Sequence, residues 1–386
     1  MEKIINTEQI PIKMWLTEIE EGALQQTKNL ANHPFAFHHI AIMSDAHVGY
    51  GMPIGGVMAT EDVIIPNAVG VDIGCGMCAV KTSKKQIDNN TLKKIMSGIR
   101  ARVPLGFKHH KQKQAEHRMP RGPEGTEIVK REYQKALKQI GTLGGGNHFI
   151  EIQKGDDGYI WLMVHSGSRN IGLQVAEHYN KVAKRNRGKY KSKVPIKWQL
   201  DYLPVDSKEG MKYYDEMKFC VNFALGNRKL MMERIKEIFS EETGGCDFDE
   251  LINIAHNYAA NENHFGKSVW VHRKGATQAK MDQLGIIPGS QGANSYIVKG
   301  KGNPESFRSC SHGSGRKMGR REARRKLNLS REVKKLEEKG VLHSIRGSRD
   351  LDEAPGAYKN ISMVMKQQKD LVEILVELEP LAVIKG

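Results

Sequence analysis

Asp72 and Cys75 are the first residues in the chain whose types and spacing could support metal chemistry. They are three residues apart, and Gly70 and Gly76 flank them, so the backbone can turn both side chains toward one point. An ionised carboxylate and a thiolate are the charged ligands that a metal ion prefers. Cys78 completes a CxxC sequence with Cys75, but a redox motif of this kind opens a helix after a strand, which the glycine-rich surroundings argue against.

Two histidines, His148 and His165, flank a predicted β-hairpin. Residues 149–153 and 159–164 are apolar and β-branched, and the segment 154–158 between them has the Gly and Asp residues typical of a turn. The midpoint between positions 148 and 165 falls inside that turn. In a regular hairpin they would be cross-strand neighbours with Cβ atoms roughly 4.5–5.5 Å apart. A lone histidine is more often a packed or surface residue than a ligand, but this mirrored pair predicts a shared metal site.

His256 is a weaker candidate ligand, because it lies in a segment, 251–257, for which we predict a helix. Taken alone it is better explained as a core histidine, and the same holds for His47, His264 and His272. A set of one Cys, three His and one Asp favours zinc or iron over manganese by ligand softness. A thiolate can bridge two metals, and two ions roughly 3.5–4 Å apart are a recurring arrangement for phosphoryl chemistry.

Three glycine-rich loops, at 144–148, 288–292 and 311–316, carry polar side chains. Their backbone N–H groups could hold phosphates, although each loop could be only a tight turn. Neither the Walker spacing nor a GxGxxG motif in a βαβ context is present, which argues against P-loop and dinucleotide enzymes. In the third loop, His312 precedes a basic segment that begins at Arg316. A neutral imidazole there could attack phosphorus, or it could simply bind a carbonyl in the turn.

The charge of the chain favours a polyanionic partner. Lys and Arg number 60 against 44 Asp and Glu, a net charge of +16, and phosphates attract such a surplus. The segments 108–121 and 181–193 are dense in basic residues and are either RNA-backbone contacts or solvated loops. Within the second segment, we predict RNA contacts at Lys184, Arg185 and Arg187.

Composition also bears on the compartment. Five cysteines, an odd number, argue against a disulfide framework and favour a reducing environment. No apolar stretch is long enough to cross a membrane, and the first residues do not form a secretory signal. We therefore expect a cytoplasmic protein without a membrane partner.

The organisation of the chain predicts one large α+β domain over residues 1–386, with mixed sheets and surrounding helices. No linker, repeat or low-complexity segment divides it, and the glycine clusters indicate a site built from many loops. Apolar spacing predicts helices at 217–238, 319–336 and 359–378. Strands and helices alternate without a βαβ rhythm, which argues against a doubly wound sheet.

Nine motifs together resemble those of the RtcB family of RNA ligases. In order, they are DAHVGYGMPIGGV at 45–57, VGVDIGCG at 69–76, GGNHFIE at 145–151, HSGSR at 165–169, HN at 256–257, RKGA at 273–276, PGS at 288–290, HGSGR at 312–316 and KG at 385–386. The resemblance thus extends to the last residue. Two departures are small: Gln291 stands where the family often has Met, and Ser314 where it often has Ala.

The resemblance implies a role for each group of residues. The metal ligands would be Asp72, Cys75, His148, His165 and His256, holding two Mn²⁺ ions bridged by Cys75. His312 would be the histidine that becomes guanylylated, and Asp45 is a second catalytic candidate. The GMP-binding positions would be Asn147, His148, Phe149, Ile150, Glu151, His256, Asn257, Pro288, Gly289, Ser290, Gln291, Ser295, His312, Gly313, Ser314, Gly315 and Lys385.

The resemblance further implies an activity in tRNA splicing and RNA repair. Such an enzyme uses GTP to join RNA 3′-phosphate or 2′,3′-cyclic phosphate ends to 5′-hydroxyl ends, through a guanylyl-histidine and an activated RNA 3′-end. Its partner would be RNA with broken ends, and an accessory activator protein is compatible with it.

Two other functions fit the residues. A dinuclear metallophosphoesterase acting on RNA ends would use the same five ligands without needing His312 or Lys385. A basic RNA-binding protein with a structural metal would form no covalent nucleotide.

Overall fold

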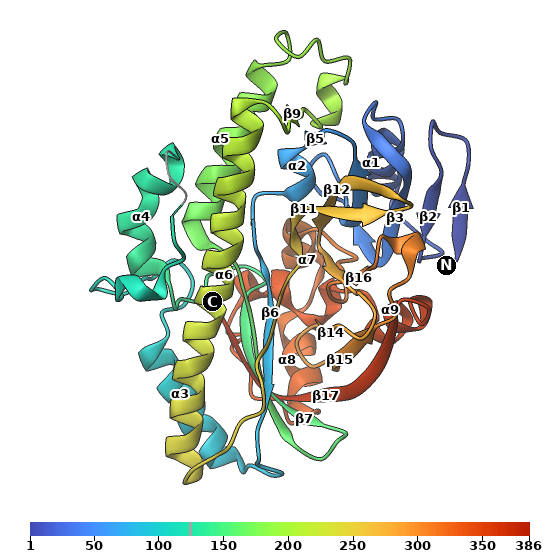
Figure 1. The fold of residues 1–386 in the computed structure, drawn as a ribbon. Helices are drawn as coiled ribbons and strands as arrows, with labels where there is room; N and C mark the ends of the chain where they lie inside the picture. Colours follow the sequence, from blue (N-terminus) through green and yellow to red (C-terminus); the bar gives the residue numbers. More distant parts are fainter. Residues whose placement is uncertain (123–125) are drawn as a thin grey trace.

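Two β-sheets form the centre of the structure (Figure 1), a computed structural model that describes residues 1–122 and 126–386. The first sheet contains, in spatial order, β1 (Lys3–Ile5), β2 (Ile12–Met14), β3 (Ala36–His47), β4 (Ile54–Thr60), β12 (Lys267–Lys274) and β11 (Asn257–His264). Its β2–β3 pair is parallel and its other pairs are antiparallel. The sheet is therefore mixed, as predicted.

The second sheet is antiparallel and carries the predicted hairpin. Its spatial order is β10 (Ile252–Ala255), β6 (Gly76–Lys81), β8 (Ile160–Ser166), β7 (Phe149–Gly155), β17 (Val372–Lys385), β15 (Ser295–Gly300) and β14 (Leu284–Ile287). Strands β7 and β8 form the hairpin, which confirms the turn prediction. The register differs by one residue, because Phe149 and not His148 is the partner of His165.

Two short strand pairs and several short elements complete the frame around the site. The pairs are β5 (Val63–Ile64) with β9 (Leu203–Pro204), and β13 (Ala276–Gln278) with β16 (Ser309–Ser311). The shorter helices are α1 (Glu21–Ala31), α2 (Pro66–Val69), α7 (Arg320–Lys326), α8 (Leu329–Glu337) and α9 (Ile361–Gln367). On the first sheet, Leu30 of α1 packs in one apolar cluster with Ile40 of β3.

One long helix, α6 (Lys208–Thr243), links the two halves of the helical layer (Figure 1). It begins where the Ser207 side chain accepts a hydrogen bond from the Gly210 N–H, and it ends at Gly244, whose φ of 68° suits glycine. Phe223 packs with α4 (Glu127–Gln139) and α5 (Arg169–Arg185), whereas Ile235 packs with α3 (Asn89–Arg102) and the second sheet. The predicted helix at 217–238 is confirmed within α6.

Three helix predictions need correction. Residues 319–336 form two helices, because Asn328 caps α8 by accepting from the Arg331 N–H and so starts a new helix. Residues 359–378 form only the short α9, after which the chain enters β17; its β-branched residues favour a strand once it pairs with β7 and β15. The segment 251–257 is not helical but spans β10 and the start of β11.

Arg228 of α6 is fully buried and ties this helix to two loops. Its guanidinium donates to the carbonyl oxygens of Gly74 and Ser166 at 2.9 and 2.8 Å, and to Asn253 Oδ1 at 2.8 Å. Gly74 precedes β6 and Ser166 ends β8, so one side chain fixes the ends of two neighbouring strands. Among the described residues, no helix is long and apolar enough to cross a membrane.

We predict that Arg228→Ala lowers the free energy of unfolding by about 3 kcal/mol, because it leaves several buried acceptors without donors. Lys229→Ala is the matched control, since Lys229 is the next residue of the same helix and is exposed. Urea denaturation followed by circular dichroism measures both variants. Equal stability of the two would show that Arg228 does not hold the loops together.

Candidate active site

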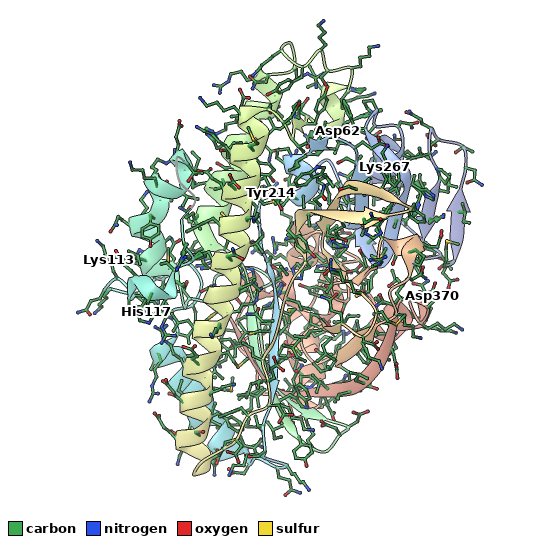
Figure 2. The ribbon with its side chains drawn as sticks, viewed as in Figure 1. Asp62, Lys113, His117, Tyr214, Lys267 and Asp370 are labelled. Carbon is green, nitrogen blue, oxygen red and sulfur yellow. The ribbon has the colours of Figure 1, made fainter. Side chains whose placement is uncertain are left out.

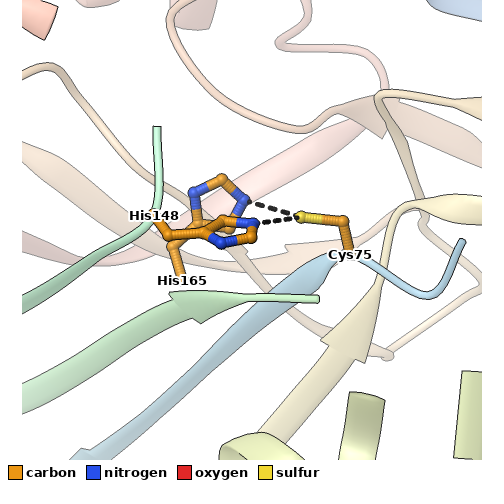
Figure 3. Close-up of side chains that lie close together, drawn as sticks. All are labelled: Cys75, His148 and His165. Atoms are coloured by element: carbon orange, nitrogen blue, oxygen red, sulfur yellow. Dashed lines mark hydrogen bonds between the residues drawn. The ribbon is translucent and has the colours of Figure 1, made fainter. Parts of the chain in front are cut away.

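Cys75, His148 and His165 converge at one end of the second sheet (Figure 3). The Cys75 Sγ lies 3.4 Å from His148 Nε2 and 3.2 Å from His165 Nε2. Cys75 directly precedes β6, His148 directly precedes β7, and His165 lies in β8, so three adjacent strands supply the three side chains. One atom from each residue lies within 4.8 Å of the others, which is a spacing that a metal ion could occupy.

The other two predicted ligands lie against this cluster. The Asp72 Oδ2 is 3.2 Å from His148 Nε2. His256 lies between β10 and β11, and its ring centroid is 5.3 Å from that of His165. Its backbone N–H donates to the Cys75 carbonyl at 2.8 Å, which fixes the strand junction to the loop that carries Asp72. The structure therefore brings all five predicted ligands together.

His148 reaches the cluster by a route that the predicted register did not anticipate. In the observed ladder, His165 is paired with Phe149, so His148 lies one residue outside the strand. The preceding turn instead directs it, and Gly144 makes room: a Cβ on Gly144 would lie 2.5 Å from His148 Nδ1. Gly167 likewise makes room for Asp72, because a Cβ there would lie 2.3 Å from Asp72 Oδ1.

The electrostatics of the cluster suit a metal ion. Burial holds the pKa values of His165 and His256 well below their usual range, so both imidazoles are neutral, which is the ligand form. Burial, and then Asp72, raise the pKa of the Cys75 thiol, and a bound cation would displace that proton. In the described parts of the chain, His148 Nδ1 and His256 Nδ1 are buried without a hydrogen-bond partner. Unpaired ring nitrogens at these two positions fit a site in which histidines bind metal ions.

His312 lies directly after β16 and is held by Asp45 of β3. Its Nδ1 is 2.5 Å from Asp45 Oδ2, and its backbone N–H donates to the same oxygen at 3.2 Å. Because Asp45 is fully buried, this contact sets the orientation of the ring and leaves Nε2 free. The His312 ring centroid is 4.7 Å from that of His256, which places His312 beside the metal cluster.

A cavity of about 430 Å³ opens beside His312. It is lined by thirteen of the predicted residues: Asn147, Phe149, Glu151, His165, Pro288, Gly289, Ser290, Gln291, His312, Gly313, Ser314, Gly315 and Lys385. The glycine-rich loops thus meet at one pocket, although they are far apart in the sequence. Gly315, at a φ of 69°, is required here because a Cβ would lie 2.0 Å from the Asp45 carbonyl oxygen.

Comparison with known proteins now identifies the family. The family described as tRNA-splicing ligase RtcB matches residues 26–386. The chain belongs to the RtcB family. It is 37% identical to the RNA-splicing ligase RtcB of Escherichia coli K12, over 100% of this chain and 99% of that protein. It is 30% identical to the tRNA-splicing ligase RtcB of Thermococcus kodakarensis, over 95% and 92% of the two chains. A third relative, the RNA-splicing ligase RtcB of Mycobacterium bovis, is also 30% identical, over 94% and 100%.

Family membership makes the protein an RNA ligase, and the predicted α+β fold is the one that this RtcB member shows. The ligase function and the Cys/His/His cluster together indicate a metal-dependent enzyme acting on RNA.

Lys385, at the end of β17, lines this cavity. Its Nζ is 3.6 Å from Glu353 Oε2 and 5.6 Å from the centre of the Phe149 ring. Burial lowers the pKa of Lys385, whereas the neighbouring carboxylates raise it. Burial also raises the pKa of Glu151 to about 8, against the opposing effect of Lys385. The carboxyl terminus is therefore a packed wall of the pocket.

Sequence reasoning missed several residues of this pocket. Its lining also includes Glu20, His47, Val48, Tyr50, Ile54, Met318, Arg320, Glu353 and Tyr358. Glu353 is the most consequential, since it contacts Lys385, Tyr358, Arg316 and Arg320 at once. It belongs to no local motif, and only the fold brings it to the site. Signals were available for other members of the lining, because His47, Val48, Tyr50 and Ile54 lie in the motif at 45–57 and Arg320 lies at the start of the basic helical segment.

Some predicted nucleotide positions lie behind the lining of the cavity. Ile150 packs in the apolar core beneath the second sheet. Asn257 donates to the Asp72 carbonyl at 3.0 Å and accepts from the Gly275 N–H at 2.7 Å. Ser295 Oγ accepts from the Gly289 N–H at 3.1 Å. The two polar residues thus support the loops that reach the cavity.

The predicted RNA contacts lie away from this pocket. Lys184 and Arg185 are exposed at the last turn of α5. This helix starts beside the site, and its 17 residues make it about 25 Å long, so its last turn lies far from the cavity. The Arg187 guanidinium is engaged in contacts inside the protein, with the buried carboxylate of Asp201 and with the Val194 carbonyl. Among the described residues, only Lys184 and Arg185 of this trio are thus available to a partner.

Among the other candidates from the sequence, His264, His272 and Cys78 make contacts within the fold and do not join the Cys75 cluster. His272 is buried and its Nε2 accepts from the Ile65 N–H at 2.9 Å, and His264 contacts Glu262 at 3.0 Å. His47 is different, since it lines the cavity. Cys78 Sγ lies 3.8 Å from the Arg228 carbonyl, facing α6 and not the metal cluster.

We predict that Cys75→Ala loses most of the bound metal, because it removes the thiolate at the centre of the cluster. Cys78→Ala is the matched control and should keep the metal content of the parent. Elemental analysis of the purified proteins measures both. Equal metal content in the Cys75 variant and the parent would contradict the assignment of Cys75.

Proposed function

We propose that this ligase uses GTP and two Mn²⁺ ions to join RNA 3′-phosphate or 2′,3′-cyclic phosphate ends to 5′-hydroxyl ends. One observation supports this above all others: His312, held by Asp45, lies between a nucleotide-sized cavity and the Cys75 cluster. A nucleophile in this position can receive a nucleotide on one side and deliver it to an RNA phosphate on the other.

The metal ions would be held by Asp72, Cys75, His148, His165 and His256. When bound, they would neutralise phosphate charge and orient the reacting oxygens. By ligand softness this set also suits zinc or iron, so manganese follows from the family and not from the donors. The metal content and activity of protein reconstituted with each ion separate these alternatives.

In the first step, His312 Nε2 would attack the α-phosphorus of GTP. A P–N bond forms, the P–O bond to the leaving group breaks, and pyrophosphate departs. The proton stays on Nδ1, where Asp45 accepts its hydrogen bond and balances the positive charge of the substituted imidazole. The buried carboxylate thus fixes the tautomer that makes Nε2 nucleophilic.

In the second step, an oxygen of the RNA 3′-phosphate would attack the phosphorus of the guanylyl-histidine. The P–N bond breaks, His312 leaves as a neutral imidazole, and the RNA end carries a diphosphate link to guanosine. A 2′,3′-cyclic end would first be opened by water to the 3′-phosphate. In the last step, the 5′-hydroxyl attacks the 3′-phosphorus, GMP leaves, and the hydroxyl proton passes to solvent.

Guanine selection would fall to the charged groups at the inner end of the cavity. The Lys385 ammonium can donate to guanine O6, whereas adenine presents an amino donor at that position. Guanine also offers an N1–H and an amino group to the Glu353 carboxylate, and adenine has no N1–H. The pocket therefore favours GTP over ATP.

The metallophosphoesterase alternative leaves much of the site unexplained. It needs the Cys75 cluster but neither the Asp45–His312 contact nor the packed Lys385. We also propose that the whole chain is one ligase domain in the cytoplasm, and that any accessory activator acts on it from outside.

His312→Ala should abolish covalent GMP attachment, because it removes the imidazole that Asp45 holds between the cavity and the Cys75 cluster. The measurement is intact mass, or a denaturing gel, after incubation with labelled GTP and Mn²⁺. His117→Ala is the control, since His117 is an exposed histidine away from the cavity and should label as the parent does (Figure 2). Acid-labile GMP on the His312 variant would place the nucleophile elsewhere.

Replacing Lys385 with Ala should weaken GTP use by tenfold or more, roughly the loss of one charge-assisted hydrogen bond. The yield of guanylyl-histidine against GTP concentration measures this, with ATP as the comparison. Glu379→Ala is the matched control, because Glu379 lies in the same strand and is exposed. If the Lys385 variant labels normally and still rejects ATP, guanine is recognised by other groups.

RNA affinity should fall steeply with salt, because phosphate contacts release counterions. Lys184→Ala with Arg185→Ala should reduce the slope of log affinity against log salt by roughly 1.4 for single-stranded RNA. Arg187 is left intact because its contact with Asp201 is structural. Lys93→Ala with Lys94→Ala, both exposed on α3, is the control. A slope equal to that of the parent would make the end of α5 a solvated surface only.

A further inference from the structure

Phe107 is the most exposed large apolar residue of the described chain, at 102% of its reference area. It lies in the segment 103–114, between α3 and α4, and directly precedes the first of the two basic segments, 108–121. An aromatic ring held fully in water is unfavourable unless something covers it. The ligase site as described so far gives this ring no role.

The backbone beside Phe107 touches the rim of the active site. The Gly106 N–H donates to the Gly144 carbonyl at 3.1 Å, and Arg169 donates to the Gly106 carbonyl at 2.8 Å. Gly144 in turn lies against His148, one of the candidate metal ligands. The terminal Gly386 also packs against Gly106. Phe107 therefore directly follows a residue that is hydrogen-bonded to the turn supporting His148.

The segment is held firmly on both sides of the ring. The His110 N–H donates to the Lys138 carbonyl at 2.9 Å, and the Gln114 N–H donates to the Leu137 carbonyl at 2.8 Å. Arg234 of α6 donates to Gln114 Oε1 at 2.6 Å. These contacts hold the loop that carries Phe107 in place. Binding of a ligand that stacks on the ring therefore does not lose the entropy that ordering the loop would cost.

The surroundings of the ring are cationic. Lys108, Lys111 and Lys113 are all exposed, and Lys113 projects outward from this edge in Figure 2. Within residues 1–122 and 126–386, no carboxylate forms an ion pair with Lys108, Lys111 or Lys113. An exposed aromatic ring among free cations is the combination that single-stranded nucleic acids bind, with bases on the ring and phosphates on the cations.

We infer that Phe107 is a stacking platform for a base of the RNA strand whose end lies at the metal centre, with Lys108 and Lys111 binding its backbone. This rests on the proposed ligation of RNA and adds a binding subsite to it. Because the ring is so close to the rim, the stacked base would be within the first few nucleotides of the reacting end. Stacking tolerates every base, so this subsite would hold RNA ends of any sequence.

The test is binding of the full-length protein to a single-stranded RNA with a 3′-phosphate, measured by fluorescence anisotropy. Phe107→Ala should weaken binding by about tenfold, within the range for loss of one stacked base. Phe107→Trp should retain the affinity of the parent. Met281→Ala, an exposed apolar residue elsewhere, is the control and should change nothing.

A series of RNAs, each with one abasic position near the 3′-end, locates the stacked base. At one position, removal of the base should weaken binding to the parent but not to the Phe107→Ala variant, because the lost contact is the same. Lys108→Ala with Lys111→Ala should reduce the salt slope by roughly 1.4, whereas Phe107→Ala should leave the slope unchanged. The two lysines on α3 again serve as the charge control.

If the Phe107→Ala variant binds RNA with the affinity of the parent, the inference is overturned, and contact with a protein partner becomes the better explanation of the exposed ring. The inference would also be overturned if Phe107→Ala weakened binding by the same factor for every RNA of the abasic series. Formation of guanylyl-histidine needs no RNA and should be unchanged in these variants. A failure of the parent to form it would contradict the proposed function, whereas a normal yield with unaltered RNA binding would contradict the stacking subsite alone.

Discussion

The structure depends above all on the burial of Cys75 among one carboxylate and three imidazoles. Such a cluster is unfavourable by itself, since burial disfavours the charged forms of Cys75, His165 and His256 and leaves ring nitrogens unpaired. Bound metal ions would offset that cost, because the thiolate and the ring nitrogens would become their ligands. Several elements of the fold keep the cluster in place. Three strands, the loop before β6 and the buried Arg228 all act on its geometry.

The second constraint is the contact between Asp45 and His312. It joins the first sheet, through β3, to the loop after β16, and it places the free nitrogen of His312 between the cavity and the cluster. Glycine is needed where these segments cross, as at Gly315 against the Asp45 backbone. Nucleotide chemistry and RNA chemistry would thus share one histidine, whose ring orientation is set by a hydrogen bond to a buried carboxylate.

Much of this site could be predicted from the sequence because local motifs carry it. The spacing of Asp72 and Cys75 and the hairpin between His148 and His165 both depend on nearby residues. The strand at 372–385 and the role of Glu353 could not be predicted, because each is decided by partners far away in the chain. The one-residue difference in register has a local cause, since it follows from the form of the turn in which the Gly155 N–H donates to the Tyr159 carbonyl. Tertiary pairing overrides the helical spacing of 359–378, and no pattern near Glu353 indicates that Lys385 will meet it.

The most direct test is a crystal structure of the protein grown with GTP and Mn²⁺, with diffraction data collected at the manganese absorption edge. The account predicts two anomalous peaks among Asp72, Cys75, His148, His165 and His256. It also predicts continuous density from His312 Nε2 to the phosphorus of GMP, with guanine O6 at hydrogen-bonding distance from Lys385 Nζ. Density for GMP on another residue, or a cavity with intact GTP and no anomalous peak at Cys75, would contradict it.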